Sequence, residues 1–147
     1  MKHLLIIFLL AFSISTANST PLPSSDEDQL SSLVDSFSLA LVKKDKVWMQ
    51  ANLNDGCKMY EPTGSTLNKS GIIMAFTQGF YSISKSEALN RTFKIDGSKA
   101  DASADLKVEG VGNINGNEMD ITGTYRFNLK FTLVESNWQI SEITISQ

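Results

Sequence analysis

The stretch Cys57-Lys58-Met59-Tyr60-Glu61-Pro62-Thr63-Gly64 decides how the rest of this chain is interpreted. It alternates as a short β-strand and then meets a proline and a glycine, which break the strand. In such a strand Cys57, Met59 and Glu61 point to one face, and the residues between them point to the other. Glu61 therefore shares a face with two apolar side chains. A carboxylate in that position loses hydration, which suits it to exchange a proton near neutral pH or to bond a polar atom of a ligand.

A helix is predicted well before this strand. Ser24 and Glu27 have the spacing of a capping box, which opens a helix that continues to Lys44. Apolar residues recur there at steps of three and four, so that they form one stripe along the helix. The residues of this stripe are Leu30, Leu33, Val34, Phe37 and Leu41.

Two shorter helices are predicted on either side of the strand. Asp45 caps the first, which ends in the turn residues Asn54-Asp55-Gly56. Ser70 caps the second, which ends near Tyr81. The side chains expected to face inward are Trp48, Met49 and Leu53 from the first, and Ile72, Ile73, Phe76 and Phe80 from the second.

The apolar period changes to two from Arg91 onward, which indicates strands. The run from Ala100 to Glu109 alternates apolar residues with largely charged ones, and Asn115-Gly116 suits a tight hairpin turn. A long strand from Met119 to Leu133 follows, with a bend expected at Gly123.

The last strand begins with Trp138 and Ile140, and its apolar phase then shifts to Ile143. Either a bulge lies near Ser141, or Glu142 points inward. The predicted fold class is thus α+β, with three N-terminal helices packed on a curved antiparallel sheet.

The N-terminal segment has the pattern of a secretory signal peptide. An apolar run from Leu4 to Ile14 leads to the small residues Ser15, Thr16 and Ala17. The run is 11 residues long, against the roughly 20 needed to span a bilayer, so no membrane span is expected. We interpret residues 1–17 as the signal peptide, 18–25 as a disordered leader and 26–147 as one domain of a secreted, extracellular protein.

Composition excludes several kinds of site from the trimmed chain. Trimming removes Lys2 and the only histidine, His3, which leaves 12 basic against 16 acidic residues, a net charge of −4. Without histidine the chain can build neither a Ser-His-Asp triad nor a histidine-based metal site, and we expect no cofactor. The acidic balance argues against nucleic acid or an anionic membrane as a partner. The single cysteine, Cys57, has no partner for an intramolecular disulfide, and we interpret it as a small buried hydrophobe.

The order of these elements resembles the nuclear transport factor 2-like superfamily. The resemblance is carried by Glu61-Pro62-Thr63-Gly64 in the middle of the chain and by Asn137-Trp138-Gln139-Ile140 at the start of the last strand. It covers roughly Gln29 to Ser146, and the superfamily includes steroid Δ-isomerases, scytalone dehydratase and SnoaL-like polyketide cyclases. The resemblance implies a cone-shaped, cystatin-like half-barrel whose helices close one side of an apolar pocket.

The best local match is to the steroid isomerases, and it makes Glu61 a candidate catalytic base. In those enzymes an acidic residue before Pro-x-Gly moves a proton between carbons, and Glu61 falls on that position. Their oxyanion tyrosine falls on Phe37, however, and their protonated aspartate falls near Leu129. Losing one oxyanion donor commonly costs about 10²-fold in rate, so losing both would leave the base without electrophilic help. The histidine and aspartate pairs of the dehydratase and the cyclases cannot be built from this chain either.

The resemblance leaves three hypotheses for the domain. The first is a binding module whose apolar pocket holds a small hydrophobic molecule that Glu61 orients, without catalysis. The second is an isomerase or dehydratase that uses Glu61 as general base. The third is an interaction module that forms a homodimer through its sheet face, with a filled pocket. We interpret Glu61 as structural or ligand-orienting in preference to catalytic. The pocket is expected to be lined by Phe37, Trp48, Met59, Glu61, Phe93, Tyr125, Phe127 and Trp138.

Two N-glycosylation sequons suit a secreted chain. They are Asn68-Lys69-Ser70 and Asn90-Arg91-Thr92. Each lies at the edge of a predicted element, where an exposed asparagine is expected. We expect a eukaryotic host to glycosylate at least one of them.

The signal peptide leads to a direct prediction. Expressed through a secretory pathway, the product should begin near Asn18, or near Thr20 if cleavage follows Ser19. N-terminal sequencing of the exported protein measures this. Export of a chain that still begins at Met1 would contradict it.

Overall fold

The structure is a computed structural model that describes residues 25–147. The predicted signal peptide lies outside the described residues, as does the predicted leader up to residue 24. Within residues 25–147, no helix is both long enough and apolar enough to cross a membrane.

Within the described residues three helices form, and a side chain caps each of them at its start. They are α1 (Asp26–Lys43), α2 (Lys46–Asn52) and α3 (Lys69–Thr77). The capping box of α1 is one residue later than predicted, because Ser25 caps the helix and exchanges hydrogen bonds with Asp28. Asp45 caps α2 as expected, its carboxylate accepting from the Trp48 amide at 2.9 Å.

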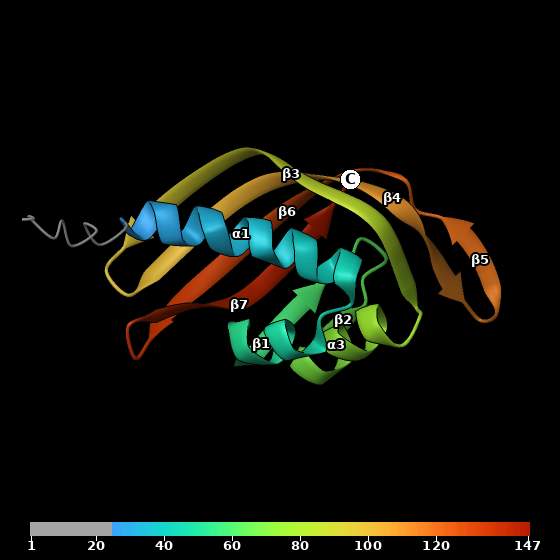
Figure 1. Ribbon diagram of the computed structural model, residues 1–147, viewed down its shortest axis with the longest axis horizontal. Coiled ribbons are helices and arrows are strands. Elements are labelled where there is room, and N and C mark those ends of the chain that lie inside the picture. Colours follow the sequence, from blue (N-terminus) through green and yellow to red (C-terminus); the bar gives the residue numbers. More distant parts are fainter. Residues whose placement is uncertain (1–24) are drawn as a thin grey trace, which may run out of the picture.

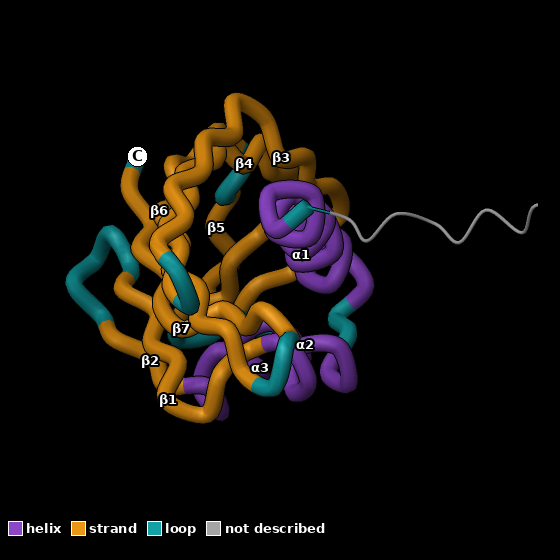
Figure 2. Tube along the Cα trace, turned by 90° about the vertical axis from the view of Figure 1, so that its left-hand side faces the viewer, coloured by secondary structure: helices purple, strands orange, loops and turns teal. Residues whose placement is uncertain are grey.

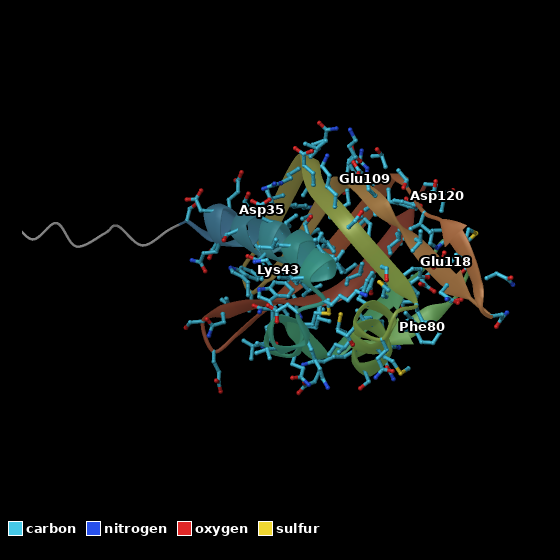
Figure 3. The ribbon with its side chains drawn as sticks, turned by 45° about the vertical axis from the view of Figure 1, so that its right-hand side comes forward. Asp35, Lys43, Phe80, Glu109, Glu118 and Asp120 are labelled. Atoms are coloured by element: carbon cyan, nitrogen blue, oxygen red, sulfur yellow. The ribbon has the colours of Figure 1, made fainter. Side chains whose placement is uncertain are left out.

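The predicted start and end of the third helix are both wrong. Asn68, and not Ser70, caps α3 by accepting from the Gly71 amide at 2.9 Å. The helix ends at Thr77, because Gly79 then takes a left-handed conformation with φ +92° and turns the chain away. Phe80 therefore lies at the surface, 50% exposed, and does not face inward (Figure 3).

In the part of the chain that the structure describes, seven strands form one mixed sheet in the order β2-β1-β7-β6-β4-β3, with β5 paired to β4. Their bounds are β1 (Leu53–Tyr60), β2 (Thr66–Asn68), β3 (Tyr81–Asp96), β4 (Lys99–Ile114), β5 (Asn117–Asp120), β6 (Gly123–Val134) and β7 (Asn137–Ser146). The expectation of a purely antiparallel sheet is wrong at one place. There β1 runs parallel to β7, with Met59 opposite Ile143 and Tyr60 opposite Thr144.

Several strand bounds also differ from those predicted. Leu53 and the expected turn Asn54-Asp55-Gly56 belong to β1, where the register shifts between Leu53 and Lys58. β3 begins at Tyr81, ten residues before the expected change of period. The single long strand expected from Met119 to Leu133 is divided into β5 and β6.

The last strand carries a bulge, which is one of the two alternatives that its sequence left open. Phe131 is opposite Ile140 and Lys130 is opposite Glu142, so Ser141 is the extra residue. Glu142 consequently forms an ion pair with Lys130, with 2.8 Å between Oε1 and Nζ.

The sheet curves round α1, while α2 and α3 lie together near β1 (Figures 1 and 2). A bulge in β3 between Leu89 and Thr92 helps to fasten α1 to the sheet. From this bulge the guanidinium of Arg91 pairs with Asp35 and donates to the Ser31 hydroxyl at 2.9 Å. The largest fully buried side chains of this core include Phe37, Phe131, Leu30, Leu41 and Met59.

The helix that fills the inner face of the sheet is much shorter than the strands it covers. At 1.5 Å per residue the 18 residues of α1 span about 27 Å, whereas the 16 residues of β4 can span about 53 Å. α1 begins beside β7, where Asp26 accepts a 3.1 Å hydrogen bond from the Trp138 indole. It ends just past Leu41. The inner face of the sheet beyond Leu41 is therefore not covered by this helix.

Cys57 is buried, as predicted, with 1% of its surface exposed, and its thiol is free. Burial raises the pKa of the Cys57 thiol to about 12, an effect that Lys69 opposes and Glu142 reinforces. The side chain therefore packs as an uncharged thiol in the core beneath β1.

Candidate functional site

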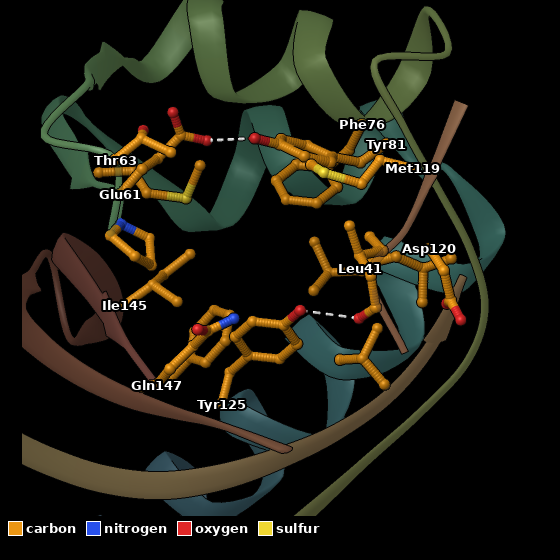
Figure 4. Close-up of a pocket in the computed structure, with 16 residues that line it drawn as sticks. Leu41, Glu61, Thr63, Phe76, Tyr81, Met119, Asp120, Tyr125, Ile145 and Gln147 are labelled. Carbon is orange, nitrogen blue, oxygen red and sulfur yellow. Dashed lines mark hydrogen bonds between the residues drawn. The ribbon is translucent and has the colours of Figure 1, made fainter. Parts of the chain in front are cut away.

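A cavity of about 350 Å³ lies on the inner face of the sheet, where α1 ends (Figure 4). Leu41 from the end of α1 forms part of its wall, and strands β1, β3, β4, β6 and β7 supply much of the rest. Its apolar lining consists of Leu41, Met59, Pro62, Phe76, Ile83, Val108, Met119, Ile121, Phe127 and Ile145. Its polar lining consists of Glu61, Thr63, Tyr81, Asp120, Tyr125 and Gln147.

Glu61 stands at the end of β1, and the turn that follows fixes its backbone. The Gly64 amide donates to the Glu61 carbonyl at 2.9 Å, and the Glu61 amide donates to the Ser65 carbonyl at 3.0 Å. Gly64 has φ +87°, which a residue with a side chain rarely adopts. This turn sets the half-buried Glu61 carboxylate at the edge of the cavity.

The Glu61 carboxylate is oriented by Tyr81, the first residue of β3. The Tyr81 hydroxyl donates to Glu61 Oε1 at 2.7 Å (Figure 4). Burial raises the pKa of the Tyr81 hydroxyl, and the hydrogen bond to Glu61 raises it further. Tyr81 therefore keeps its proton and holds one oxygen of the carboxylate in place.

The other lining hydroxyls also donate to acceptors of the protein. Tyr125 donates to the Ile121 carbonyl at 2.8 Å, on the side of the cavity opposite Glu61 and Tyr81 (Figure 4). Thr63 donates to the Ser65 hydroxyl at 3.2 Å. The hydroxyl protons of the lining are thus committed, while lone pairs remain on the tyrosine and carboxylate oxygens.

Asp120 supplies a second carboxylate at the exposed rim. It ends β5, which carries Glu118 beside it (Figure 3). Hydrogen bonds from the side chain and the backbone amide of Thr122 lower the pKa of the Asp120 carboxyl. Asp120 is therefore ionised at neutral pH.

Four of the eight residues predicted for the pocket line this cavity: Met59, Glu61, Tyr125 and Phe127. The other four, Phe37, Trp48, Phe93 and Trp138, do not, and they pack in or against the core. Phe37 lies between Trp48 and Phe127, with ring centroids 6.2 Å from each. Trp138 is buried and bonded to Asp26, far along α1 from the cavity.

Tyr81 is the lining residue on which the site depends most and which the sequence did not predict. The sequence pattern predicts a helix that ends near Tyr81, so it places this side chain on no strand. The signal available was the alternation from Tyr81 through Ile83, just after Gly79, which marks a strand start. Phe76 from α3 packs on the Tyr81 ring at 5.3 Å between centroids and holds it against Glu61.

Both sequon asparagines are exposed and bonded within the protein. Asn68 accepts from Gly71 as the cap of α3, through its side-chain oxygen. Asn90 lies in the bulge of β3 with φ 49°, and its side-chain nitrogen donates to Asp105 at 2.8 Å. A glycan on Asn90 would be attached at that same nitrogen.

No group of three or more His, Cys, Asp or Glu side chains that could hold a metal ion occurs in residues 25–147. The cavity lining itself presents carboxylates, hydroxyls, one amide and apolar walls.

Comparison with solved structures identifies the fold. No family model and no curated protein matches the sequence. Among solved structures, a nuclear transport factor 2-like (NTF2-like) protein from Cytophaga hutchinsonii superposes with a TM-score of 0.76 at 16% identity, over 84% of this chain and 98% of that one. The chain has the NTF2-like fold.

Two further solved structures are similar to this chain over most of its length. An NTF2-like protein of unknown function from Prochlorococcus gives a TM-score of 0.68 at 16% identity, over 84% of this chain and 94% of its own. A protein with a cystatin-like fold from Caulobacter vibrioides gives 0.69 at 16% identity, over 82% and 87%. At these identities the likeness establishes the fold alone.

The hydrogen bond from Tyr81 to Glu61 predicts that the protein loses stability at alkaline pH. The folded protein keeps the Tyr81 proton at a pH where the unfolded chain has released it, since an unperturbed tyrosine titrates near pH 10. The free energy of unfolding should therefore fall as the pH rises above about 10, and Tyr81→Phe should make this fall less steep. Denaturant unfolding at pH 8 to 11 measures it, with the exposed Tyr60→Phe as matched control. Equal slopes for the two variants would show that the hydroxyl is not held as described.

Proposed function

We propose that the protein is a secreted binding module that holds a small, largely apolar molecule in the cavity of a cone-shaped half-barrel, without chemical turnover. The observation that carries this proposal is the cavity of about 350 Å³, whose wall is mostly apolar and carries few polar side chains. The N-terminal pattern of residues 1–17 and the two exposed sequon asparagines support export and glycosylation of the chain.

The role proposed for Glu61 is to orient the ligand. Its Oε1 is held by Tyr81, and its backbone is fixed by the turn to Ser65, so the carboxylate is set before a ligand arrives. A preset polar group costs less ordering entropy on binding than a mobile one. One carboxylate on an apolar wall would therefore fix which end of a ligand faces it.

The hydrogen bonds of the lining support binding without catalysis. Proton abstraction by Glu61 would leave an enolate that needs a donor. Phe37 and Leu129, which stand where the resemblance to the isomerases expects donors, are buried and apolar. The Tyr125 proton is committed to the Ile121 carbonyl, and the Tyr81 proton is committed to Glu61 itself.

A second candidate is an isomerase or dehydratase with Glu61 as general base, and one observation favours it. A tyrosine hydroxyl does lie within reach of Glu61, at 2.7 Å. Such a hydroxyl could turn from the carboxylate to a substrate oxygen during a reaction.

The dimerising alternative receives little support from the outer face of the sheet. That face carries polar and charged ladders that are already paired, including Arg126 with Asp105 at 2.9 Å and Lys130 with Glu142 at 2.8 Å. The centre of a stable homodimer interface is usually depleted in charged residues.

If the ligand binds in the cavity, a substitution that fills the cavity should lower the affinity of the protein for the ligand. The uncharged fluorescent probe N-phenyl-1-naphthylamine should bind saturably to the protein. Val108→Phe, which adds a ring at a lining position, should weaken this binding at least about tenfold. Fluorescence titration measures the affinity.

Val134→Phe is the matched control, because Val134 is 37% exposed and does not line the cavity. Thermal unfolding of both variants checks that they fold, and Ile145→Phe replaces Val108→Phe if the latter does not. Absence of probe binding to the unaltered protein, or equal affinity in the lining variant and the control, would refute the proposal.

The two candidate functions predict different turnover. We expect negligible conversion of a Δ5-ketosteroid to its conjugated isomer, because no lining hydroxyl is free to stabilise the enolate. Ultraviolet absorbance of the conjugated enone follows the reaction. Conversion that disappears in Glu61→Gln would instead establish the second candidate.

A further inference from the structure

We infer that the ligand of this cavity is an amphiphilic amine, whose protonated nitrogen lies at Glu61 and whose apolar body fills the cavity. This inference rests on the proposed function, because it names the class of molecule that the same cavity takes.

The first observation is the sign of the charge around the cavity. The described lining contains two acidic side chains, Glu61 and Asp120. It contains no lysine, arginine or histidine. A fatty acid or another anion would place its charge beside Glu61 without any cation to balance it. An ammonium group in the same place meets an opposite charge in partly dehydrated surroundings, where the attraction is stronger than in bulk water.

The second observation is the balance of donors and acceptors. The hydroxyls of Tyr81, Tyr125 and Thr63 all donate to protein atoms. Their lone pairs and the carboxylate oxygens accept, so the described lining offers many acceptors, and the Gln147 amide is its one uncommitted side-chain donor group. An ammonium group is a donor with no acceptor, and it therefore complements this lining better than a carbonyl or a carboxylate does.

The third observation is the aromatic surface next to Glu61. The Phe76 and Tyr81 rings pack at 5.3 Å between centroids, and both line the cavity. Tyr81 thus reaches Glu61 with its hydroxyl and presents its ring beside the same point (Figure 4). These rings give the apolar body of the amine an aromatic surface to pack on next to Glu61.

The two carboxylates would act on the ammonium group at different distances. Glu61 would contact the ammonium group directly. Asp120 is exposed at the rim and acts at longer range, through a field that salt screens.

Competition against N-phenyl-1-naphthylamine tests the inference at neutral pH. Octylamine, octanol and octanoate share one apolar chain and differ in the charge of the polar end. We expect octylamine to displace the probe at a concentration about tenfold lower than octanol, and octanoate to be the weakest of the three. Glu61→Gln should reduce the advantage of octylamine over octanol to about twofold or less, a ratio that is corrected for the probe affinity measured in the same variant.

Asp120→Asn is the matched variant outside the contact, and its smaller effect should vanish at 0.5 M salt, where the screening length is only about 4 Å. If Glu61→Gln does not fold, Tyr81→Phe provides the second test, because the carboxylate stays and octylamine should remain the strongest competitor.

The outcomes separate the two proposals. Failure of the unaltered protein to bind the probe overturns the proposed function itself. Saturable probe binding with octanol or octanoate as strong a competitor as octylamine leaves the cavity as a binding site and overturns the amine. An octylamine preference that survives intact in Glu61→Gln also overturns the assignment of the ammonium to Glu61.

Discussion

The parallel ladder between β1 and β7 is the constraint on which the rest of this structure depends. It joins a strand from the first half of the chain to the last strand, with Met59 opposite Ile143. Parallel neighbours cannot be joined by a tight hairpin, so the intervening chain must leave β1 and return through the whole antiparallel part of the sheet. The strand that presents Glu61 is thereby held beside Ile145 of β7, and both become part of one cavity wall.

Local patterns in the sequence predicted much of this fold because they depend on neighbouring residues only. Asp45 caps a helix, and Asn115-Gly116 turns a hairpin with positive φ at both residues. The alternation from Ala100 to Val108 matches buried and exposed positions of β4. The parallel pairing was not predictable in the same way. Its register depends on residues about 85 positions apart, and no local period records which strand lies beside β1.

Half of the residues predicted to line the pocket do line the cavity. The predicted residues differ in whether strand phase alone is enough to place them there. Met59 and Phe127 are apolar residues in the correct phase of a strand, and phase alone places them on the inner face. Phase does not say how far along the sheet α1 reaches, so Phe37 and Trp138 were assigned to the cavity although they belong to the core. Tyr81 was missed because the end of α3 depends on Gly79 taking φ +92°, a conformation that glycine permits and does not require.

The cavity exists because α1 is much shorter than the strands of the sheet. Its chemistry depends on the residues that line the uncovered part of the inner face. On its inner face β4 presents the small, buried side chains of Ala100, Ala102 and Ala104. Further along the strand the larger residues Leu106 and Val108 follow, and Val108 lines the cavity. A purely apolar gap of this kind would gain stability by collapsing or by larger side chains. Glu61 opposes that outcome, because collapse would bury a carboxylate held by a single tyrosine hydroxyl, and burying a charge with so few partners costs more than the apolar contact returns. The carboxylate that we propose to orient the ligand thus also favours an open cavity.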